Sequence, residues 1–148
     1  MIAAIDPGAK GAIAILDGEQ IIEICDLSKE PEKVINSCLV TYGVKQAVVE
    51  QVGVMPHDSK VAGFNFGINV GRILAACSLS GCEVVRVKPR TWQAWCKIYG
   101  SGNTKKLGYS IVRQVYGSDL FLGPRGGLKD GRVDAVLIGL WFGNTTTN

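Results

Sequence analysis

Four acidic side chains stand where apolar segments of the sequence begin or end, and their positions suit metal-ion chemistry. Asp6 and Glu50 each end a short apolar run, and Asp130 and Asp134 lie at the start of the last one. Carboxylate oxygens are the ligands that Mg²⁺ and Mn²⁺ prefer in proteins. If folding gathers these four groups, we expect a site for divalent cations that activate water for hydrolysis.

Each acid taken alone has an ordinary structural explanation. Asp6 before Pro7-Gly8 fits a turn, Glu50 fits a solvated strand end, and acids near a helix start interact favourably with the helix dipole. These explanations weaken together, because Asp134 lies inside the apolar run 133–136, where an unpaired carboxylate is costly. A bound cation would remove that cost.

Apolar periodicity and turn residues divide the chain into strands and helices. Three short apolar segments joined by Gly-containing turns open the chain as an antiparallel set, and later strands are separated by helical patterns. Pro31 fits the first turn of a helix that Gly43 would close. We predict strands at 2–6, 11–16, 20–25, 46–50 and 83–87, helices at 31–43, 60–80, 90–98, 104–116 and 130–142, and a Gly-rich loop at 117–129.

This order of elements predicts an α/β fold, a mixed five-stranded sheet with helices on both faces, in one domain over residues 1–143 with a frayed tail at 144–148. The first and fourth strands can be parallel neighbours, so Asp6 and Glu50 would emerge side by side at their carboxyl ends. Asp130 and Asp134 are four positions apart, which puts both carboxylates on one face of the last helix. This spacing points the two helix carboxylates toward one place.

The distribution of charge favours a polyanionic partner. Residues 1–74 hold 6 Lys and Arg against 9 Asp and Glu, whereas residues 75–148 hold 10 against 4. Aromatic residues are interleaved with the basic ones, which suits nucleic acid, although an ordinary solvated surface would give a similar bias. The candidate phosphate contacts are the helix-start residues Lys105 and Lys106, and further candidates are Lys88, Arg90 and Lys10. Trp92 would either stack on DNA or fill the core.

Other classes of protein are disfavoured by composition. The longest apolar stretches are far shorter than the roughly 20 residues that span a bilayer, and no basic segment followed by an apolar one opens the chain, so we expect a cytoplasmic protein without a membrane partner. Five cysteines without Cys-x-x-Cys spacing and a single histidine argue against a zinc site. We expect these cysteines to be mostly reduced and buried.

Four motifs together resemble a known family. In order along the chain they are Ile5-Asp6-Pro7-Gly8, Val49-Glu50-Gln51-Val52, the segment from Gly67 to Gly71-Arg72, and Asp130 with Asp134-Ala135. They resemble motifs of the RuvC-type Holliday junction resolvases of bacteria and phages, which have a ribonuclease H-like fold, and the pattern is closer to the phage-type members. The likeness spans most of the chain.

The resemblance implies an endonuclease that resolves four-way DNA junctions by paired, metal-dependent phosphodiester hydrolysis. It implies two Mg²⁺ ions per site, about 3.5–4 Å from each other, with Mn²⁺ able to substitute. The residues implied to hold these ions are Asp6, Glu50, Asp130 and Asp134. Lys105 matches the neighbourhood of a family lysine that aids cleavage. The residues expected to contact DNA are Lys10, Arg72, Lys88, Arg90, Lys105 and Lys106.

Two departures from the family pattern and one repeat bear on assembly and substrate. The last acidic pair is spaced by four residues where bacterial members often use three, and Gly53 stands where they carry a phenylalanine that wedges into the junction. Met55 or His57 would then open the junction. Glycines recur every four residues in the 60–80 helix, at Gly63, Gly67 and Gly71, which suits either packing on the sheet or the seam of a homodimer.

Three alternatives stay open. A ribonuclease H-like nuclease acting on other branched DNA or on RNA-containing substrates would use the same acids. A non-catalytic nucleic-acid-binding module would need the basic surface but not the acids. The opening Asp6 to Gly11 also resembles the phosphate loop of sugar kinases and actin-like ATPases, but those proteins need a second domain that 148 residues leave no room for.

Overall fold

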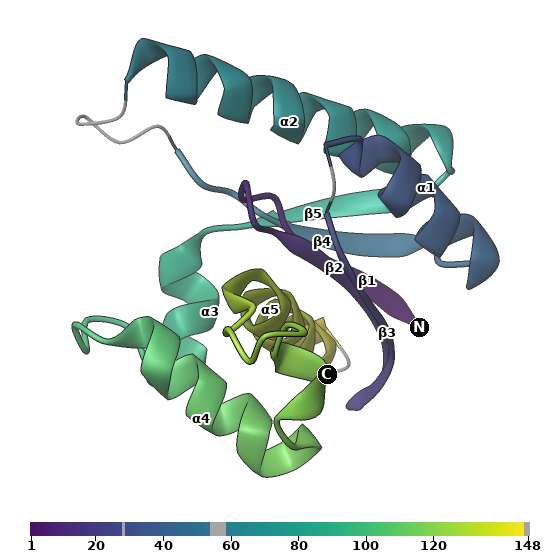
Figure 1. The fold of residues 1–148 in the computed structure, drawn as a ribbon. Helices are drawn as coiled ribbons and strands as arrows, with labels where there is room; N and C mark the ends of the chain where they lie inside the picture. The colour runs from purple at the N-terminus through teal and green to yellow at the C-terminus, as the bar shows by residue number, and fades with distance from the viewer. Residues whose placement is uncertain (28, 54–58, 147–148) are drawn as a thin grey trace.

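Five strands form one mixed sheet in the computed structural model, which describes residues 1–27, 29–53 and 59–146 (Figure 1). The strands run in the order β3-β2-β1-β4-β5 across the sheet. β1 pairs antiparallel with β2, and β2 with β3, whereas β4 is parallel to both β1 and β5. The bounds are β1 Ile2–Asp6, β2 Ala12–Asp17, β3 Gln20–Asp26, β4 Gln46–Glu50 and β5 Glu83–Val87.

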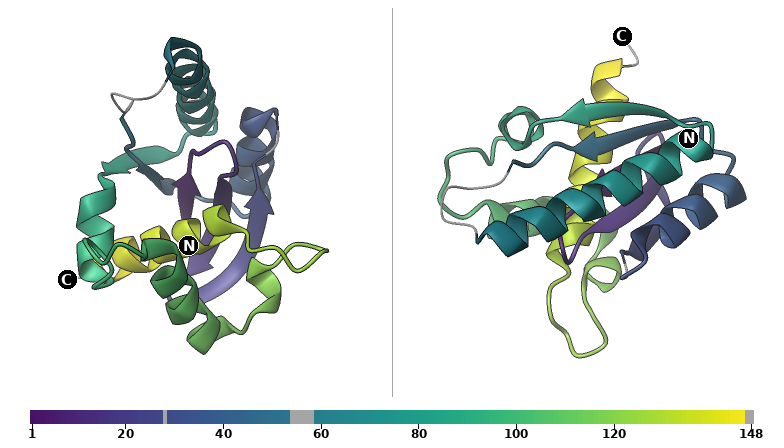
Figure 2. Two further views of the ribbon diagram at one scale, coloured as in Figure 1. Left: turned by 60° about the vertical axis from the view of Figure 1, so that its left-hand side comes forward. Right: turned by 90° about the horizontal axis from the view of Figure 1, so that it is seen from above.

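Helices cover both faces of this sheet, as Figure 1 shows, and the predicted fold class is confirmed. Helices α1 (Pro31–Thr41) and α2 (Lys60–Leu79) pack on one face. Helix α5 (Asp130–Thr146) lies on the other face, with α3 (Pro89–Trp95) and α4 (Thr104–Tyr116) packed against it. Seen from above in Figure 2, α1 and α2 lie side by side across the strands.

The alternation of side chains along the central strands decides which face each residue meets. Ala3 and Ile5 of β1 are fully buried in the core beneath α1 and α2, whereas Ala4 is fully buried in the core beneath α5. Because successive strand residues point to opposite faces, the acids that end β1 and β4 point toward α5. Asp6 and Glu50 therefore lie on the sheet face that carries the last helix.

Two glycines let α5 lie directly on the sheet. A Cβ on Gly139 would stand 2.5 Å from Leu16 Cδ1 and 3.1 Å from the Cβ of Ala4. A Cβ on Gly131 would stand 2.2 Å from the carbonyl oxygen of Lys10 in the β1–β2 turn. Both positions need glycine because a larger residue would push the helix away from β1 and β2. The close approach brings the first turns of α5 to the carboxyl end of β1.

Three helix ends differ from the sequence prediction by two residues or more. Helix α1 ends at Thr41 rather than 43, and α3 ends at Trp95 rather than 98, shortly before Lys97 with a φ of 60°. Helix α5 runs to Thr146 rather than 142, so residues 144–146 are helical and not frayed. The Asn144 side chain donates to the Leu140 carbonyl at 2.9 Å, and the two following threonine hydroxyls bond back to the helix in the same way, which extends the last turn.

Nowhere in the described ranges is a helix both long and apolar enough to cross a bilayer.

Candidate active site

Asp6 and Glu50 lie side by side at the carboxyl ends of β1 and β4. The parallel register pairs Ile5 with Val49, so the two acids are the next residues on neighbouring strands. The backbone N–H of Gly8 donates to Asp6 Oδ1 at 2.9 Å, which fixes that carboxylate at the start of the β1–β2 turn. Burial raises the pKa of Asp6, and the hydrogen bond from Gly8 opposes the increase.

Glu50 is buried and hydrogen-bonded to a tryptophan. Its exposed fraction is 7%, and the indole Nε1–H of Trp92 in α3 donates to Glu50 Oε1 at 2.8 Å. Burial raises the pKa of Glu50 to about 7, the Trp92 hydrogen bond opposes this, and the charge of Asp6 adds to it. Trp92 is thus both a core residue, as one reading of the sequence expected, and a donor that orients an acid of the site.

Asp134 links the helix acids to the strand acids. Burial is the main cause that raises the pKa of Asp134 to about 7, followed by the charges of Asp6, Glu50 and Asp130. One carboxylate therefore interacts electrostatically with each of the other three. The sequence predicted that these four acids converge, and in the structure the charges of the other three act on Asp134.

Lys105 stands at the edge of this acid cluster, which consists of Asp6, Glu50, Asp130 and Asp134. Its ammonium group forms an ion pair of 2.5 Å with Asp130 Oδ2, and its side chain is 71% exposed. The contact with Asp130 raises the pKa of Lys105, with smaller contributions from Asp134 and Asp6. Since Lys105 lies in the first turn of α4, this helix brings a cation to the acids of α5.

The acid cluster matches divalent cations in its chemistry. As arranged here, no three His, Cys, Asp or Glu side chains of the described residues are grouped closely enough to hold one ion. Three of the four carboxylates accept hydrogen bonds from protein donors instead: Asp6 from the Gly8 backbone, Glu50 from Trp92 and Asp130 from Lys105. Burial, and to a smaller extent the charges of neighbouring acids, raises the pKa values of Asp6, Glu50 and Asp134. A divalent cation would offset both effects, and hard oxygen donors are the ligands that Mg²⁺ prefers.

Most of the predicted DNA-contacting residues lie on elements that also carry residues of the site. Lys106 follows Lys105 in α4, and Lys10 is exposed in the β1–β2 turn. Lys88 and Arg90 begin α3, directly after the carboxyl end of β5. The Arg90 guanidinium lies over the Tyr99 ring, 5.4 Å from its centroid, which restrains its position.

Arg72 is not brought to the acid cluster. Its guanidinium forms a 2.7 Å ion pair with Glu32 of α1 and donates to the Lys29 carbonyl at 2.9 Å. These contacts join α2 to α1 and to the segment just before it, on the sheet face opposite to α5. The two residues expected to open a junction, Met55 and His57, lie outside the described residues.

Asp26 shows the limit of the sequence signal. It ends β3 as Asp6 ends β1, yet its carboxylate is bound by Arg132 at 2.6 Å and by Lys129 at 3.0 Å. These cations, Arg132 first, hold the pKa of Asp26 below its ordinary value. Acids at strand ends are thus of two kinds: Asp26 is neutralised by cations, whereas Asp6 is buried near other acids. Only the three-dimensional arrangement distinguishes them.

Comparisons with known proteins support the fold. No protein-family model matches the sequence, and no curated protein is significantly similar to it. Among solved structures, Thermus thermophilus RuvC in complex with a Holliday junction substrate is 17% identical over 99% of this chain and 96% of its own, with a TM-score of 0.66. A second T. thermophilus RuvC structure gives 19% identity, coverage of 99% and 96%, and a TM-score of 0.65.

A viral protein gives the same result. The Fowlpox virus resolvase in complex with Holliday junction DNA is 18% identical over 98% of this chain and 99% of its own, with a TM-score of 0.60. The lengths of these proteins match that of the present chain almost completely. The resemblance to RuvC-type resolvases that the motifs indicate is confirmed in the backbone, and the chain has the fold of these Holliday junction resolvases.

Proposed function

We propose that this chain is a structure-selective endonuclease that resolves four-way DNA junctions by metal-dependent hydrolysis of phosphodiesters. The observation that carries the proposal is the acid cluster, in which the Asp134 carboxylate interacts with the other three acids. Structures of the same fold that are described as Holliday junction complexes give the proposal its substrate. A protein with this activity would work in the cytoplasm of the cell that makes it.

The acid cluster would hold two Mg²⁺ ions, and Mn²⁺ would substitute. Asp6 and Glu50 would share the ions, Asp134 would hold one, and Asp130 would ligate the second or position the attacking water. Bound ions would supply an activated water on one side of the phosphodiester and stabilisation of the leaving oxygen on the other.

Two residues of the chain prepare the cluster for this chemistry. The indole of Trp92 holds Oε1 of Glu50 at 2.8 Å and so fixes the orientation of a buried carboxylate. Lys105 neutralises Asp130 in the absence of substrate, and its exposed side chain can turn its ammonium group toward a phosphate oxygen. Lysine at this position would therefore stabilise negative charge that develops on the phosphate.

Phosphates next to the cleaved bond would contact the basic residues that border the site. Lys10, Lys88, Arg90 and Lys106 are exposed or half-buried. Removal of any one of them should weaken DNA binding and reduce its dependence on salt, because each phosphate contact releases counterions. Arg72 is engaged with α1 and does not belong to this set.

The protein is proposed to act as a homodimer through α2. Val61 and Phe64 are each 70% exposed and Ile68 is 47% exposed, at spacings that put them on one stripe of this helix. A Cβ on Gly67 or Gly71 would meet nothing within 4 Å, so this part of the helix is open to a partner. Two symmetric nicks need two sites related by a two-fold axis, which such a seam would provide.

The experiment that tests the proposed function compares substrates. The protein is incubated in Mg²⁺ with a labelled four-way junction, a linear duplex, a Y-branched DNA and an RNA–DNA hybrid. Cleavage confined to the junction supports the proposal. Preference for the hybrid, or indifference to branching, would keep a metal-dependent nuclease and reject the junction as its substrate. Junction binding without cleavage of any substrate would indicate a binding module.

A further inference from the structure

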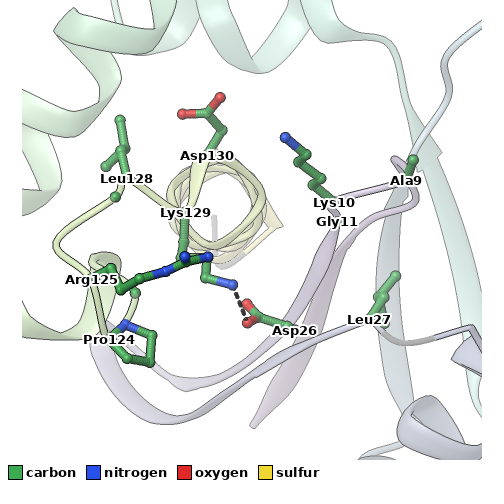
Figure 3. A pocket seen from close by; sticks show the side chains of 12 residues that line it. Ala9, Lys10, Gly11, Asp26, Leu27, Pro124, Arg125, Leu128, Lys129 and Asp130 are labelled. Carbon is green, nitrogen blue, oxygen red and sulfur yellow. Dashed lines mark ion pairs between the residues drawn. The ribbon is translucent and has the colours of Figure 1, made fainter.

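A groove of about 540 Å³ opens beside the acid cluster and is lined largely by residues without a role in the proposed chemistry (Figure 3). One wall is the β1–β2 turn with Lys10, and the floor includes Asp26 at the end of β3. The other wall is the segment before α5, with Arg125 and Lys129. The groove reaches Asp130, so whatever occupies it lies next to the candidate active site.

The wall that carries Arg125 is a defined hairpin rather than a loose loop. Leu122 pairs with Leu128 as an antiparallel bridge, and the backbone N–H of Gly123 donates to the Gly127 carbonyl at 2.8 Å. Next to this pair, the backbone N–H of Lys129 donates to the carbonyl of Phe121 at 2.8 Å, and the Phe121 side chain is fully buried. In both views of Figure 2 this hairpin projects from the body of the protein. The exposed Arg125 is thus presented from an ordered turn at little cost in conformational entropy.

The charges around the groove leave two cations unneutralised. Asp26 is bound by Lys129 and Arg132, and Asp130 is bound by Lys105. Lys10 and Arg125 form no ion pair with any other residue that the structure describes. Two such cations on opposite walls of one groove form a site of positive potential that attracts an anion.

We propose that this groove binds the sugar–phosphate backbone of the DNA strand beside the cleaved phosphodiester, with Arg125 and Lys10 as its phosphate contacts. The inference rests on the proposed function, because the groove opens onto Asp130. An extended backbone suits the open groove, since a strand that crosses the acid cluster continues along one of its sides. A guanidinium contacts phosphate through two parallel hydrogen bonds, which makes Arg125 the stronger of the two contacts.

The test measures junction affinity as a function of salt for Arg125→Gln and for the double variant Arg125→Gln/Lys10→Gln. Fluorescence anisotropy with a labelled four-way junction, in Ca²⁺ to support binding, covers about 50 to 200 mM salt. Loss of one phosphate contact reduces the magnitude of the slope of log affinity against log salt by about 0.9. We therefore expect a reduction of about 0.9 in the single variant and about twice that reduction in the double variant. At the lowest salt the single variant should bind about 5- to 10-fold more weakly, since each contact contributes a comparable share.

The control is Lys45→Gln, which removes one positive charge from an exposed residue just before β4, at the opposite end of the sheet. It should leave the slope unchanged. Equal effects of Arg125→Gln and Lys45→Gln would show that net charge alone is sensed and would overturn the proposal. A nuclease that cleaves junctions but shows no slope change in Arg125→Gln would refute the groove alone. A protein that binds DNA through this groove but cuts nothing would refute the nuclease and leave the groove.

Discussion

Replacement of Asp134 by asparagine should stabilise the metal-free protein at pH 8, although it removes a candidate metal ligand. Burial, with the charges of three neighbouring acids, raises the pKa of Asp134 from 3.8 to about 7. Between these two values the folded carboxyl keeps its proton while the unfolded one has lost it. The folded state then binds more protons than the unfolded state, so the free energy of unfolding falls as pH rises through this window.

The size of the effect follows from the shift. One pKa unit corresponds to 1.36 kcal/mol, so a shift of roughly three units amounts to about 4 kcal/mol as an upper bound. More than half of this is lost between pH 5 and pH 8, because the folded carboxyl titrates at about pH 7. The other acids share the mutual repulsion, so we expect the asparagine variant to be about 1–2 kcal/mol more stable than the wild type at pH 8, and this advantage to shrink at pH 5.

Urea unfolding in EDTA at pH 5 and pH 8 measures this difference directly. Asp119→Asn, on an exposed acid of the 3₁₀ turn Asp119–Phe121, is the matched control and should change stability little at either pH. A variant of Asp134 that is less stable than the wild type at pH 8 would refute the reasoning. So would a difference that is the same at both pH values. Addition of Mg²⁺ should raise the melting temperature of the wild type and not that of the variant.

Three further substitutions test single contacts of the site and its scaffold. Trp92→Phe keeps a ring in the core but leaves Glu50 Oε1 without its donor. About 10-fold more Mg²⁺ should then be needed for half-maximal cleavage, because a hydrogen bond to a metal ligand fixes the orientation of that ligand. An unchanged requirement in a Mg²⁺ titration would contradict this role. Lys105→Gln should lower the cleavage rate at saturating junction by about 10²-fold while junction affinity changes little, whereas an equal loss of both would indicate a binding role only. Gly139→Ala should cost about 1–3 kcal/mol in urea unfolding because its Cβ would meet Leu16. Gly127→Ala is the control and should change stability little, since a Cβ there would meet nothing within 4 Å.

Much of the scaffold could be predicted because local patterns and tertiary structure agree. β5 was predicted at the observed residues, and so was α4, where the change from strand to helix periodicity is sharp. The four acids could be predicted as a group because two end neighbouring strands and two share a helix face. The end of α5 could not, since its last turn depends on Asn144 and threonine side chains that bond back to the helix, and such residues usually predict a loop.

The remaining features depend on contacts between distant parts of the chain. Nothing near Trp92 in the sequence indicates that its indole reaches Glu50, 42 residues away. The hairpin that carries Arg125 lies in a Gly-rich segment that predicts only a loop, because a single isolated bridge and three backbone hydrogen bonds define it. Acids that end strands look alike until their partners are known, as Asp26 and Asp6 demonstrate.

The central claim is that the acid cluster cuts four-way junctions, and cleavage of one labelled junction by the wild type and by Asp134→Asn tests it most directly. All four strands are labelled separately, and junction binding in Ca²⁺ is measured alongside to establish that both proteins engage the substrate. The account predicts paired nicks at symmetric positions with the wild type in Mg²⁺, and intact junction with the variant despite comparable binding. Cleavage by the variant at the wild-type rate, or no cleavage by a wild type that binds the junction, would contradict it.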